Sequence, residues 1–326
     1  MNTSLDPQSP APDRQPAIRA VGLRKTFGET VAVADLNLAV AEGEIFGLVG
    51  PDGAGKTTAI RLLLALLAPD AGEVRIGGYD LRRQPREARA IVGYVPQQFA
   101  LYGDLSVAEN MRFVAEVRGL EPQSYARRAH ELLALAGLAP FTERLARDLS
   151  GGMRQKLSLL SALLHQPRIL LLDEPTTGVD PVSRRDFWRL LYPLAAQGVA
   201  LLISTPYLDE AQRCHRLGFM VAGRLLAVDT PEGLLRRMPD ALIEIRTEER
   251  IEARRLLRQR REVRRVEVIG GALRVAFDPH APDLDAGRAL CRWLAEQGIP
   301  VAACEPATAT LADVFSALSD SSGGSP

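Results

Sequence analysis

Apolar residues recur along the chain in two patterns that predict strands. Residues 18–21 and 31–34 are short apolar segments between Gly and Asp residues, as is typical of strands near the edge of a sheet. The runs at 44–49, 169–172 and 199–204 do not alternate with polar residues, which is typical of strands covered on both faces in a parallel sheet. Loops and helical segments separate these runs, so the first two thirds of the chain are predicted to form an α/β domain.

Helical periodicity fills much of the chain between those strands. Helices are predicted at residues 57–67 and 181–197, and a return strand with a Gly-Gly turn at residues 73–78. The stretch from 105 to 165 is mostly helical, so we expect an inserted helical subdomain over about residues 98–165.

A second, smaller domain is predicted after residue 231, where the pattern of apolar residues changes. Strands and helices are expected in the order βαββαβ, at residues 241–247, 249–260, 265–269, 273–277, 284–297 and 300–305. This order predicts a small ferredoxin-like α+β domain over residues 240–318. We place the end of the first domain, residues 18–232, between Pro231 and Pro239.

The two ends of the chain lack the apolar patterns of folded segments. Residues 1–17 contain four prolines among polar residues and no basic start followed by an apolar run, which predicts a disordered leader and no signal peptide. Residues 319–326 are rich in Ser and Gly and are predicted to be a disordered tail. The longest apolar stretches stop at about eight residues, whereas a membrane-spanning helix needs about 20.

Length and charge are those of a globular protein with two domains. The chain has 326 residues, with 40 Lys and Arg residues against 40 Asp and Glu residues, so its formal net charge is zero. This balance implies no dominant electrostatic partner, and no nucleic acid is expected. The helix at 249–260 is rich in Arg, but acidic residues interleave, which favours a solvated face over a nucleic-acid or lipid-headgroup site. Cys214, Cys291 and Cys304 form no CxxC pair and are too few and scattered for a disulfide framework, which indicates a reducing compartment.

Residues 50–57, GPDGAGKT, fit the phosphate-binding pattern GxxxxGK[ST] between a predicted strand and a predicted helix. The glycines let successive backbone amides converge on phosphate groups, and the helix N-terminus adds partial positive charge. Lys56 is expected to reach the β and γ phosphates, and the Thr57 hydroxyl to bind Mg²⁺. The competing interpretation is a Gly-rich turn with a surface lysine. The candidate nucleotide contacts of this segment are Gly50, Asp52, Gly53, Gly55, Lys56, Thr57 and Thr58.

Two adjacent carboxylates follow the second continuous apolar run. At the carboxyl end of a buried strand, Asp173 is placed to hold Mg²⁺, and Glu174 beside it can polarise an attacking water. The competing interpretation is that one of the two caps the following turn.

Residues 149–153, LSGGM, come just before that run, and here the chain resembles the ATP-binding subunits of ABC transporters, over about residues 18–232. Ser150 can cap a helix while Gly151 and Gly152 expose its first amides, which makes a second anion site; a helix cap alone is the competing interpretation. The resemblance implies a P-loop NTPase fold with a mixed sheet, and ATP and Mg²⁺ as ligands. It also implies a second ATPase subunit, identical or different, because in the family the second anion site binds the γ-phosphate held by the partner.

Further residues are assigned through this resemblance. Phe27 matches the aromatic residue that stacks on adenine, although a buried core Phe is the competing interpretation. Gln97 matches the glutamine that senses Mg²⁺ and the water and couples the site to the membrane subunit, and its neighbour Gln98 leaves the register open. Asp180 matches the aspartate that meets the partner across the dimer. The catalytic candidates are Lys56, Gln97 and Glu174, and the candidate Mg²⁺ ligands are Thr57, Gln97 and Asp173.

Three residues depart from the family pattern. Pro206 stands where the family usually has a histidine that contacts the γ-phosphate, and proline has neither a side-chain donor nor a backbone N–H. We therefore expect slow hydrolysis with binding retained, and the Thr205 or Tyr207 hydroxyl is a candidate for a weaker contact. Met153 replaces the usual Gln, and Asp52 a common Asn. The anion site at Ser150, Gly151 and Gly152 is expected to remain intact despite Met153. Asp52 either weakens nucleotide or partner contacts or is a tolerated variant.

The C-terminal region, which ends in ATLADVF at residues 309–315, resembles the small appended domain of ATPases in type-2 drug and polysaccharide exporters. Together with the motifs, this resemblance implies the ATP-binding subunit of a type-2 ABC exporter of drugs or of other hydrophobic or polysaccharide-type substrates. Such a subunit works at the cytoplasmic face of the bacterial inner membrane with a separate permease. Residues 141–148 lack the sequence typical of exporters that fuse both domains, which agrees with a separate membrane subunit. Three alternatives stay open: an ATP-dependent clamp that leaves turnover to a partner ATPase, a soluble ABC ATPase acting on DNA or translation, and an importer subunit.

Overall fold

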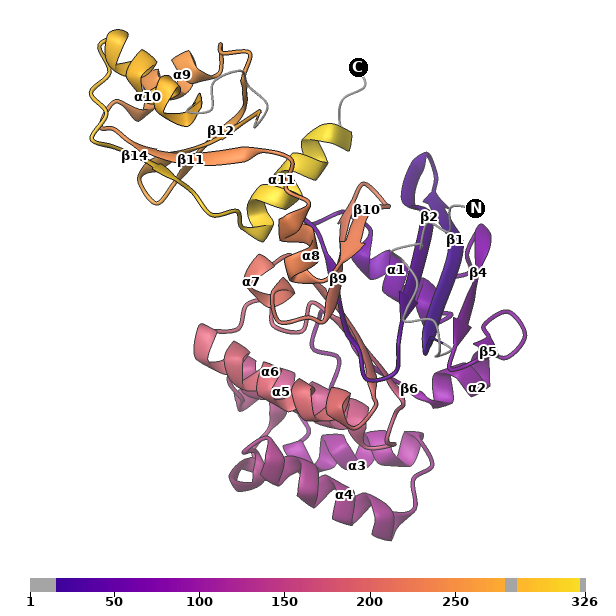
Figure 1. Ribbon diagram of the computed structural model, residues 1–326. Coiled ribbons are helices and arrows are strands. Elements are labelled where there is room, and N and C mark those ends of the chain that lie inside the picture. Colours follow the sequence, from indigo (N-terminus) through magenta and orange to yellow (C-terminus); the bar gives the residue numbers. More distant parts are fainter. Residues whose placement is uncertain (1–15, 279–285, 323–326) are drawn as a thin grey trace. The chain divides into compact units, whose positions relative to one another are not determined.

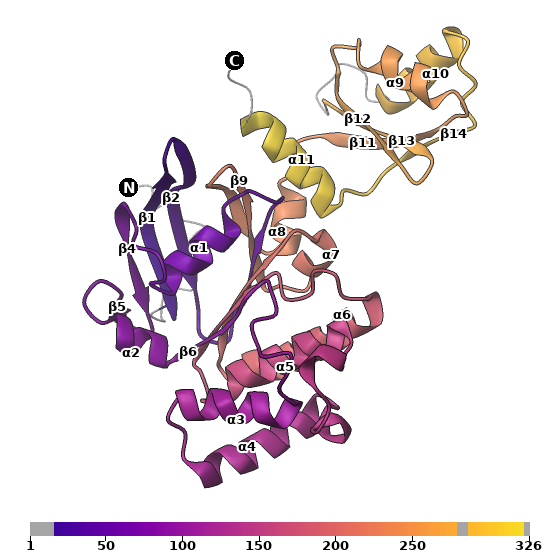
Figure 2. The same cartoon turned by 180° about the vertical axis from the view of Figure 1, so that it is seen from behind.

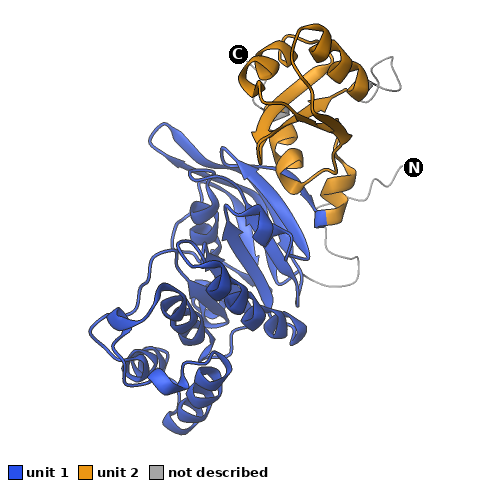
Figure 3. Ribbon diagram, turned by 90° about the vertical axis from the view of Figure 1, so that its left-hand side faces the viewer, with its two compact units in different colours: residues 1–231 blue, residues 232–326 orange. Residues whose placement is uncertain are grey.

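The computed structural model describes residues 16–278 and 286–322, and the chain divides into two compact units (Figure 3). The first unit ends at Pro231 and the second begins at Glu232, at the start of the range in which the sequence places the boundary. Residues 1–15 of the expected leader and 323–326 of the expected tail lie outside the described residues. No helix in the described part of the chain is long and apolar enough to cross a membrane.

A six-stranded mixed sheet forms the centre of the first unit, in the order β10-β9-β3-β8-β7-β6. Its strands are β3 (Ile45–Val49), β6 (Val92–Val95), β7 (Ile169–Asp173), β8 (Ala200–Thr205), β9 (Arg216–Val221) and β10 (Arg224–Asp229). All neighbours pair in parallel except β9 and β10, which are antiparallel. Strands β3, β7 and β8 are buried throughout, because apolar clusters cover both faces of the sheet, as the continuous apolar runs predict.

An antiparallel sheet covers one face of the central sheet, in the order β2-β1-β4-β5. Its strands, with the helix that follows them, are β1 (Ile18–Phe27), β2 (Thr30–Val40), β4 (Ala71–Ile76), β5 (Tyr79–Asp80) and α2 (Pro85–Ala90). Helix α1 (Lys56–Leu63) lies between the two sheets and contacts β2 and β7 (Figure 1). It ends before the predicted residue 67, because the backbone turns into the left-handed region at Ala65.

Helices cover the other face and extend into the expected helical subdomain (Figure 2). They are α3 (Val107–Val117), α4 (Pro122–Leu135), α5 (Gly151–Leu163) and α6 (Pro181–Ala196), with short turns η1 (Ala139–Phe141), η2 (Ala146–Asp148) and α7 (Leu208–Ala211). Helix α5 contacts α3, α4, α6 and β6, so it links the subdomain to the sheet. The start of α3 is fixed because Ser106 and Glu109 each accept a hydrogen bond from the other's backbone amide.

The second unit is built on an antiparallel sheet with the order β12-β13-β11-β14. Its elements, after α8 (Pro231–Arg236) at the junction, are β11 (Ala241–Arg246), α9 (Arg250–Leu257), β12 (Val263–Ile269), β13 (Ala272–Phe277), α10 (Ala286–Glu296), β14 (Ala303–Pro306) and α11 (Leu311–Ser322). Helix α9 packs on β12 and β13, and α10 packs on β11 and β14. The βαββαβ order and this strand order are ferredoxin-like, as the sequence predicts.

Helix α11 corrects the prediction of a disordered tail, because it includes residues 319–322. The side chains of Leu311 and Val314 are buried, and the Arg274 guanidinium of β13 binds both carboxylate oxygens of Asp313, at 2.7 and 2.8 Å. Burial would raise the pKa of Asp313, but hydrogen bonds from Arg274 and Thr310 outweigh it and hold that pKa below its usual range. An ion pair from the sheet therefore anchors a helix that Ser and Gly content alone would not predict.

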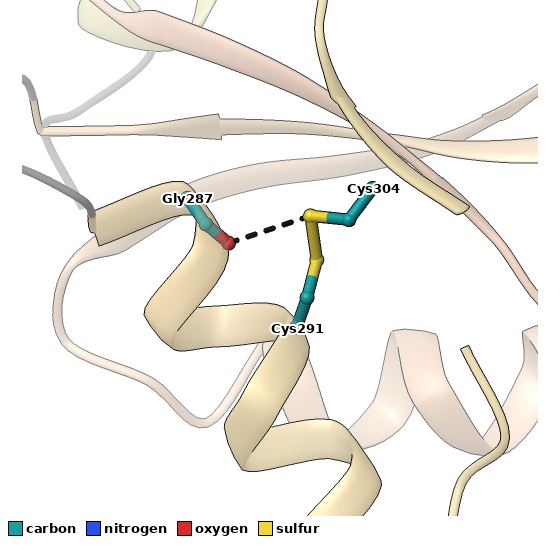
Figure 4. The surroundings of a disulfide bond; sticks show 3 residues. All are labelled: Gly287, Cys291 and Cys304. Carbon is teal, nitrogen blue, oxygen red and sulfur yellow. Dashed lines mark hydrogen bonds between the residues drawn. A yellow bond between two sulfur atoms is a disulfide. The ribbon is translucent and has the colours of Figure 1, made fainter. Parts of the chain in front are cut away.

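A disulfide joins Cys291 of α10 to Cys304 of β14, so the prediction that the cysteines are too scattered for disulfide bonding is wrong for these two, and they no longer indicate a reducing compartment (Figure 4). The two residues are 13 positions apart in sequence, but packing of α10 beside β14 brings their Cα atoms to 6.4 Å. Cys214 of the first unit remains a free thiol, and burial raises its pKa.

Candidate functional site

The phosphate loop, residues 50–55, connects the end of β3 to the start of α1. A Cβ at Gly50 would lie 2.1 Å from the Met220 carbonyl oxygen, and one at Gly55 would lie 2.2 Å from that of Ala32. Gly55 also has a φ of +102°, in the region that favours glycine. The two glycines are therefore required by the close approach of β2 and β9 to the loop.

Lys56 lies folded back into this loop. Its Nζ donates to the carbonyl oxygens of Gly50 at 2.8 Å and of Pro51 at 3.0 Å, and forms an ion pair of 3.0 Å with Glu174 Oε1. Both charged side chains are almost fully buried, at 3% and 5% exposure. The competing interpretation of a surface lysine is therefore wrong. Because a buried charge needs a partner, an anion that enters the loop would compete with Glu174 for the ammonium.

Asp173 is the last residue of β7, and its two carboxylate oxygens have different surroundings. Its Oδ1 accepts hydrogen bonds from Thr57 Oγ1 at 3.1 Å and from Ser204 Oγ at 2.6 Å. Its Oδ2 is buried and has no hydrogen-bond partner among the described residues. A buried acceptor without a partner is costly, and hard cations such as Mg²⁺ prefer oxygen ligands. The donor set formed by Asp173, the Thr57 hydroxyl and the Gln97 amide therefore fits Mg²⁺.

Glu174 is held in a strained and fixed position. Its φ is +46°, which is uncommon for a residue with a side chain, and its backbone N–H donates to Ser204 Oγ at 2.9 Å. Its Oε2 accepts hydrogen bonds from Gln97 Nε2 at 3.0 Å and from Thr177 Oγ1 at 3.3 Å. These side-chain contacts come from Lys56, Gln97 and Thr177, and of these the contact with Thr177 lies within the following turn.

The structure places Gln97, just after β6, in reach of the site. Its Nε2 donates a hydrogen bond to Oε2 of Glu174, which lies 77 positions later in the sequence. Gln98 is exposed and makes no such contact in the described structure. This geometry favours Gln97 over Gln98 for the register that the sequence leaves open. In the phosphate loop, Asp52 and Gly53 are exposed. Thr58, in the first turn of α1, is half-buried.

The LSGG segment forms the cap and first turn of α5. Ser150 Oγ accepts a hydrogen bond from the Met153 amide at 3.3 Å, and Gly151 and Gly152 are the first two helical residues. A Cβ at Gly152 would lie 2.5 Å from Ser183 Cβ, so this glycine also permits the close packing of α5 on α6. The Met153 side chain packs against the apolar core.

Asp180 caps α6 beside that segment. Its Oδ1 accepts hydrogen bonds from the amides of Val182 at 3.1 Å and Ser183 at 2.9 Å, and the bond from Ser183 above all lowers the pKa of the carboxyl. In the described structure, no hydrogen bond joins Ser150 or Asp180 to the phosphate loop. The candidate phosphate contacts of the chain therefore form two sets, one at the start of α1 and one at the start of α5.

Phe27 ends β1 and is 48% exposed, so it is no core residue. The Lys25 ammonium lies 5.7 Å from the centre of its ring. The ring is therefore free to stack on a planar ligand, and adenine stacking stays a prediction.

The surroundings of Pro206 remove one of the two proposed substitutes for the missing histidine. Thr205 is buried, and its hydroxyl donates its proton to Glu210 Oε2 at 2.8 Å. The Tyr207 ring stacks on the Arg184 guanidinium at 4.3 Å. The suggestion that Thr205 supplies a contact is therefore wrong, because this hydroxyl is already used inside the fold.

Glu210 is a site residue that the sequence did not reveal. It is fully buried, and its carboxylate accepts hydrogen bonds from the hydroxyls of Thr176 and Thr205 and pairs with Arg184 Nε at 3.5 Å. It therefore ties the loop after Glu174 to the segment that carries Pro206. In the sequence Glu210 stands in a short polar stretch, and nothing there signals that it is buried.

The histidines have structural or surface positions where they are described. His215 Nδ1 accepts a hydrogen bond from the Ile45 amide at 2.9 Å, and His165 Nε2 lies 3.1 Å from the Val92 carbonyl oxygen. Burial lowers the pKa of His165, and His130 is exposed. His280 lies outside the described residues.

A sequence model of the ABC transporter family matches residues 33–177. The chain is 45% identical over 219 residues to a protein of Escherichia coli described as a probable multidrug ABC transporter ATP-binding protein, which covers 67% of this chain and 38% of that protein. The chain thus spans well under half the length of that relative. It is 41% identical to the Nod factor export ATP-binding protein I of Paraburkholderia xenovorans, over 67% of this chain and 72% of that one.

A match over nearly the whole chain comes from the daunorubicin resistance ATP-binding protein of Streptomyces coeruleorubidus, which is 37% identical over 92% of this chain and 94% of that one. Among solved structures, the ATP-binding subunit of an ABC transporter has 30% identity and a TM-score of 0.62, over 68% of this chain and 92% of that one. A dimeric ATP-binding cassette in a post-hydrolysis state, bound to ADP and phosphate, has 26% identity and a TM-score of 0.60, over 65% of this chain and 98% of that one.

Proposed function

The chain belongs to the ABC transporter family, and on that premise we propose that it is the ATP-hydrolysing subunit of an exporter, acting through a separate membrane permease. The observation that carries this proposal is the single cluster formed by Lys56, Glu174, Gln97 and Asp173, with a buried carboxylate oxygen left open. The names of the relatives, which concern multidrug, Nod factor and daunorubicin export, support an exported drug or polysaccharide-type substrate.

Phosphate binding can release Glu174 from its buried ion pair with Lys56, so that Glu174 can act as a general base. When phosphate oxygens take the Lys56 ammonium, Glu174 Oε1 loses its partner, while Gln97 and Thr177 still hold Oε2. The freed oxygen then accepts the proton of the attacking water. Thr57, Asp173 and Gln97 would hold Mg²⁺, and the ion would supply positive charge that neutralises the phosphates.

A second subunit completes the site in this proposal. The helix N-terminus at Ser150, Gly151 and Gly152 supplies amides to the γ-phosphate held by the partner, and Asp180 lies at the junction. Two chains, or this chain and a different ATPase half, thus close around two ATP molecules. The solved dimer of a related cassette supports this arrangement.

The permease is proposed to dock on the helical subdomain next to Gln97. Exposed aromatic rings lie there, since Tyr102 is 53% and Phe113 39% exposed, with their centres 4.9 Å apart. Gln97 then couples this surface to Glu174. The complex would place the chain at the cytoplasmic face of the bacterial inner membrane.

One observation favours a second candidate function. Pro206 leaves the site without the usual donor, and the Thr205 hydroxyl is already bound to Glu210. The chain would then be an ATP-dependent clamp that closes but leaves most turnover to a more active ATPase partner.

The function is tested by phosphate release from Mg²⁺ and ATP, measured for the purified chain alone and with membranes that contain its permease. We expect ATP binding in both cases and faster release with the permease, and we expect removal of Mg²⁺ with EDTA to abolish release. A chain that does not bind ATP, or that releases phosphate equally well without Mg²⁺, would contradict the assignment.

Replacing Glu210 with Gln is expected to lower kcat about fivefold with little change in KM, because the loss of one hydrogen-bond acceptor costs about 1 kcal/mol. The loops that carry Thr176 and Pro206 lose their shared carboxylate, while the phosphate contacts remain. Asp209→Asn is the matched control, since Asp209 also contacts Arg184 but its side chain is 64% exposed. An equal effect of the two substitutions, or a change in KM alone, would show that Glu210 does not position the catalytic loops.

A further inference from the structure

An open groove of about 590 Å³ lies on the second unit, between α9 and the edge strand β12. It is lined by four arginines and two aliphatic residues and by no carboxylate: Arg250, Ile251, Arg254, Arg255, Arg258 and Val268. Helix α9 packs on the sheet through Ala253 and Leu257, so its arginine face points away from the core.

Positive charge in the groove is largely uncompensated. Arg255 is paired with Glu252, with Nε 2.9 Å from Oε2. Within the described residues, the other three arginines of the groove form no ion pair, and Arg250 donates only to the Gly271 carbonyl oxygen, at 3.4 Å. The Nε atom of Arg254 is buried without a hydrogen-bond partner. A guanidinium with free donors binds phosphate oxygens in pairs, which fits a phosphate ligand.

Exposed aliphatic side chains make this groove amphiphilic. Ile251 is 89% exposed and Val268 49% exposed, beside the arginines. A nucleic acid would leave these two side chains without a partner, and the lining offers no aromatic ring for base stacking. Arginines beside exposed aliphatic residues match the boundary between lipid headgroups and acyl chains.

We propose that this groove binds the phosphate headgroups of anionic phospholipids, with Ile251 and Val268 against the upper part of the acyl chains. The second unit thus docks on an acidic membrane surface through α9. This proposal departs from the solvated face that the sequence favours, because the interleaved acidic residues do not line the groove. This inference goes beyond the proposed ATPase function and does not depend on it, because it rests on charge and shape in the second unit alone.

The test is flotation of the full, nucleotide-free chain with vesicles of phosphatidylglycerol and phosphatidylcholine in equal amounts, against vesicles of phosphatidylcholine alone. We expect binding only to the anionic vesicles, weakened by salt and by about fivefold for each arginine removed in Arg254→Ala and Arg258→Ala. Ile251→Ser is expected to weaken vesicle binding but not the binding of soluble glycerol phosphate.

The matched control is Arg261→Ala with Arg292→Ala, which removes the same charge from exposed positions outside the groove. An equal loss in this control, or equal binding to both kinds of vesicle, would overturn the proposal. Tighter binding to an RNA oligonucleotide or an acidic peptide would assign the groove to that partner instead. Self-association that is lost in the groove variants would assign it to a second copy. Thermal unfolding of each variant shows whether the fold is intact.

Discussion

Glu174→Gln is expected to slow phosphate release by about a hundred- to ten-thousandfold, the range that a positioned general base contributes. Glutamine keeps the size of the side chain and its hydrogen bond to Gln97, but it cannot take a proton from water. The Lys56 ammonium also loses its buried counter-charge, so it is more available to phosphate. ATP binding should therefore be retained or tightened while turnover falls, and nucleotide binding and single-turnover phosphate release measure the two separately.

The matched control for this prediction is Glu143→Gln, because Glu143 is exposed and lies outside the cluster. Its turnover should equal that of the native chain. Substantial turnover by Glu174→Gln would mean that another group accepts the proton. A loss of ATP binding together with turnover would mean that the Glu174 carboxylate mainly shapes the phosphate loop.

Pro206→His is expected to raise turnover in the assembled complex by about one to two orders of magnitude. Pro206 follows β8 directly, and the Gly50 amide of the phosphate loop donates to the Thr205 carbonyl oxygen at 3.3 Å, so residue 206 stands next to the loop. A hydrogen bond to a charged group contributes about 1.5–3 kcal/mol, and each 1.4 kcal/mol corresponds to about a tenfold change in rate. A histidine here adds a side-chain donor that proline cannot supply.

Pro206→Ala tests whether a change in turnover comes from the added side-chain donor or from the loss of the rigid proline ring. Alanine adds the backbone N–H and backbone freedom but no side-chain donor, so its turnover should stay close to that of the native chain. An equal rise with alanine would show that the rigid ring, and not the missing donor, limits hydrolysis. Unchanged turnover with histidine would show that another residue supplies the contact and that the chain is an ordinary transport ATPase.

The phosphate loop, the adjacent carboxylates and the LSGG segment could be predicted because each is local. Residues 50–57 lie between a buried strand and a helix, and the continuous apolar runs that frame them are covered on both faces, as the sequence indicates. The caps formed by Ser150 and Asp180 join residues within three positions of each other, so spacing alone describes them. The βαββαβ order of the second unit likewise follows from local periodicity.

Contacts between distant segments were decided only by the tertiary structure. Glu210 is buried and binds Thr205, which removes that hydroxyl from the list of phosphate contacts. Cys291 and Cys304 meet because α10 packs beside β14, and α11 is anchored by Asp313 to a strand formed 39 positions earlier. The sequence fixes the chemistry that each residue offers, but the partner of a side chain depends on which elements pack together. The amino-acid sequence by itself therefore determined the fold class and the candidate reacting groups, while packing determined which of those groups are left free of contacts inside the fold.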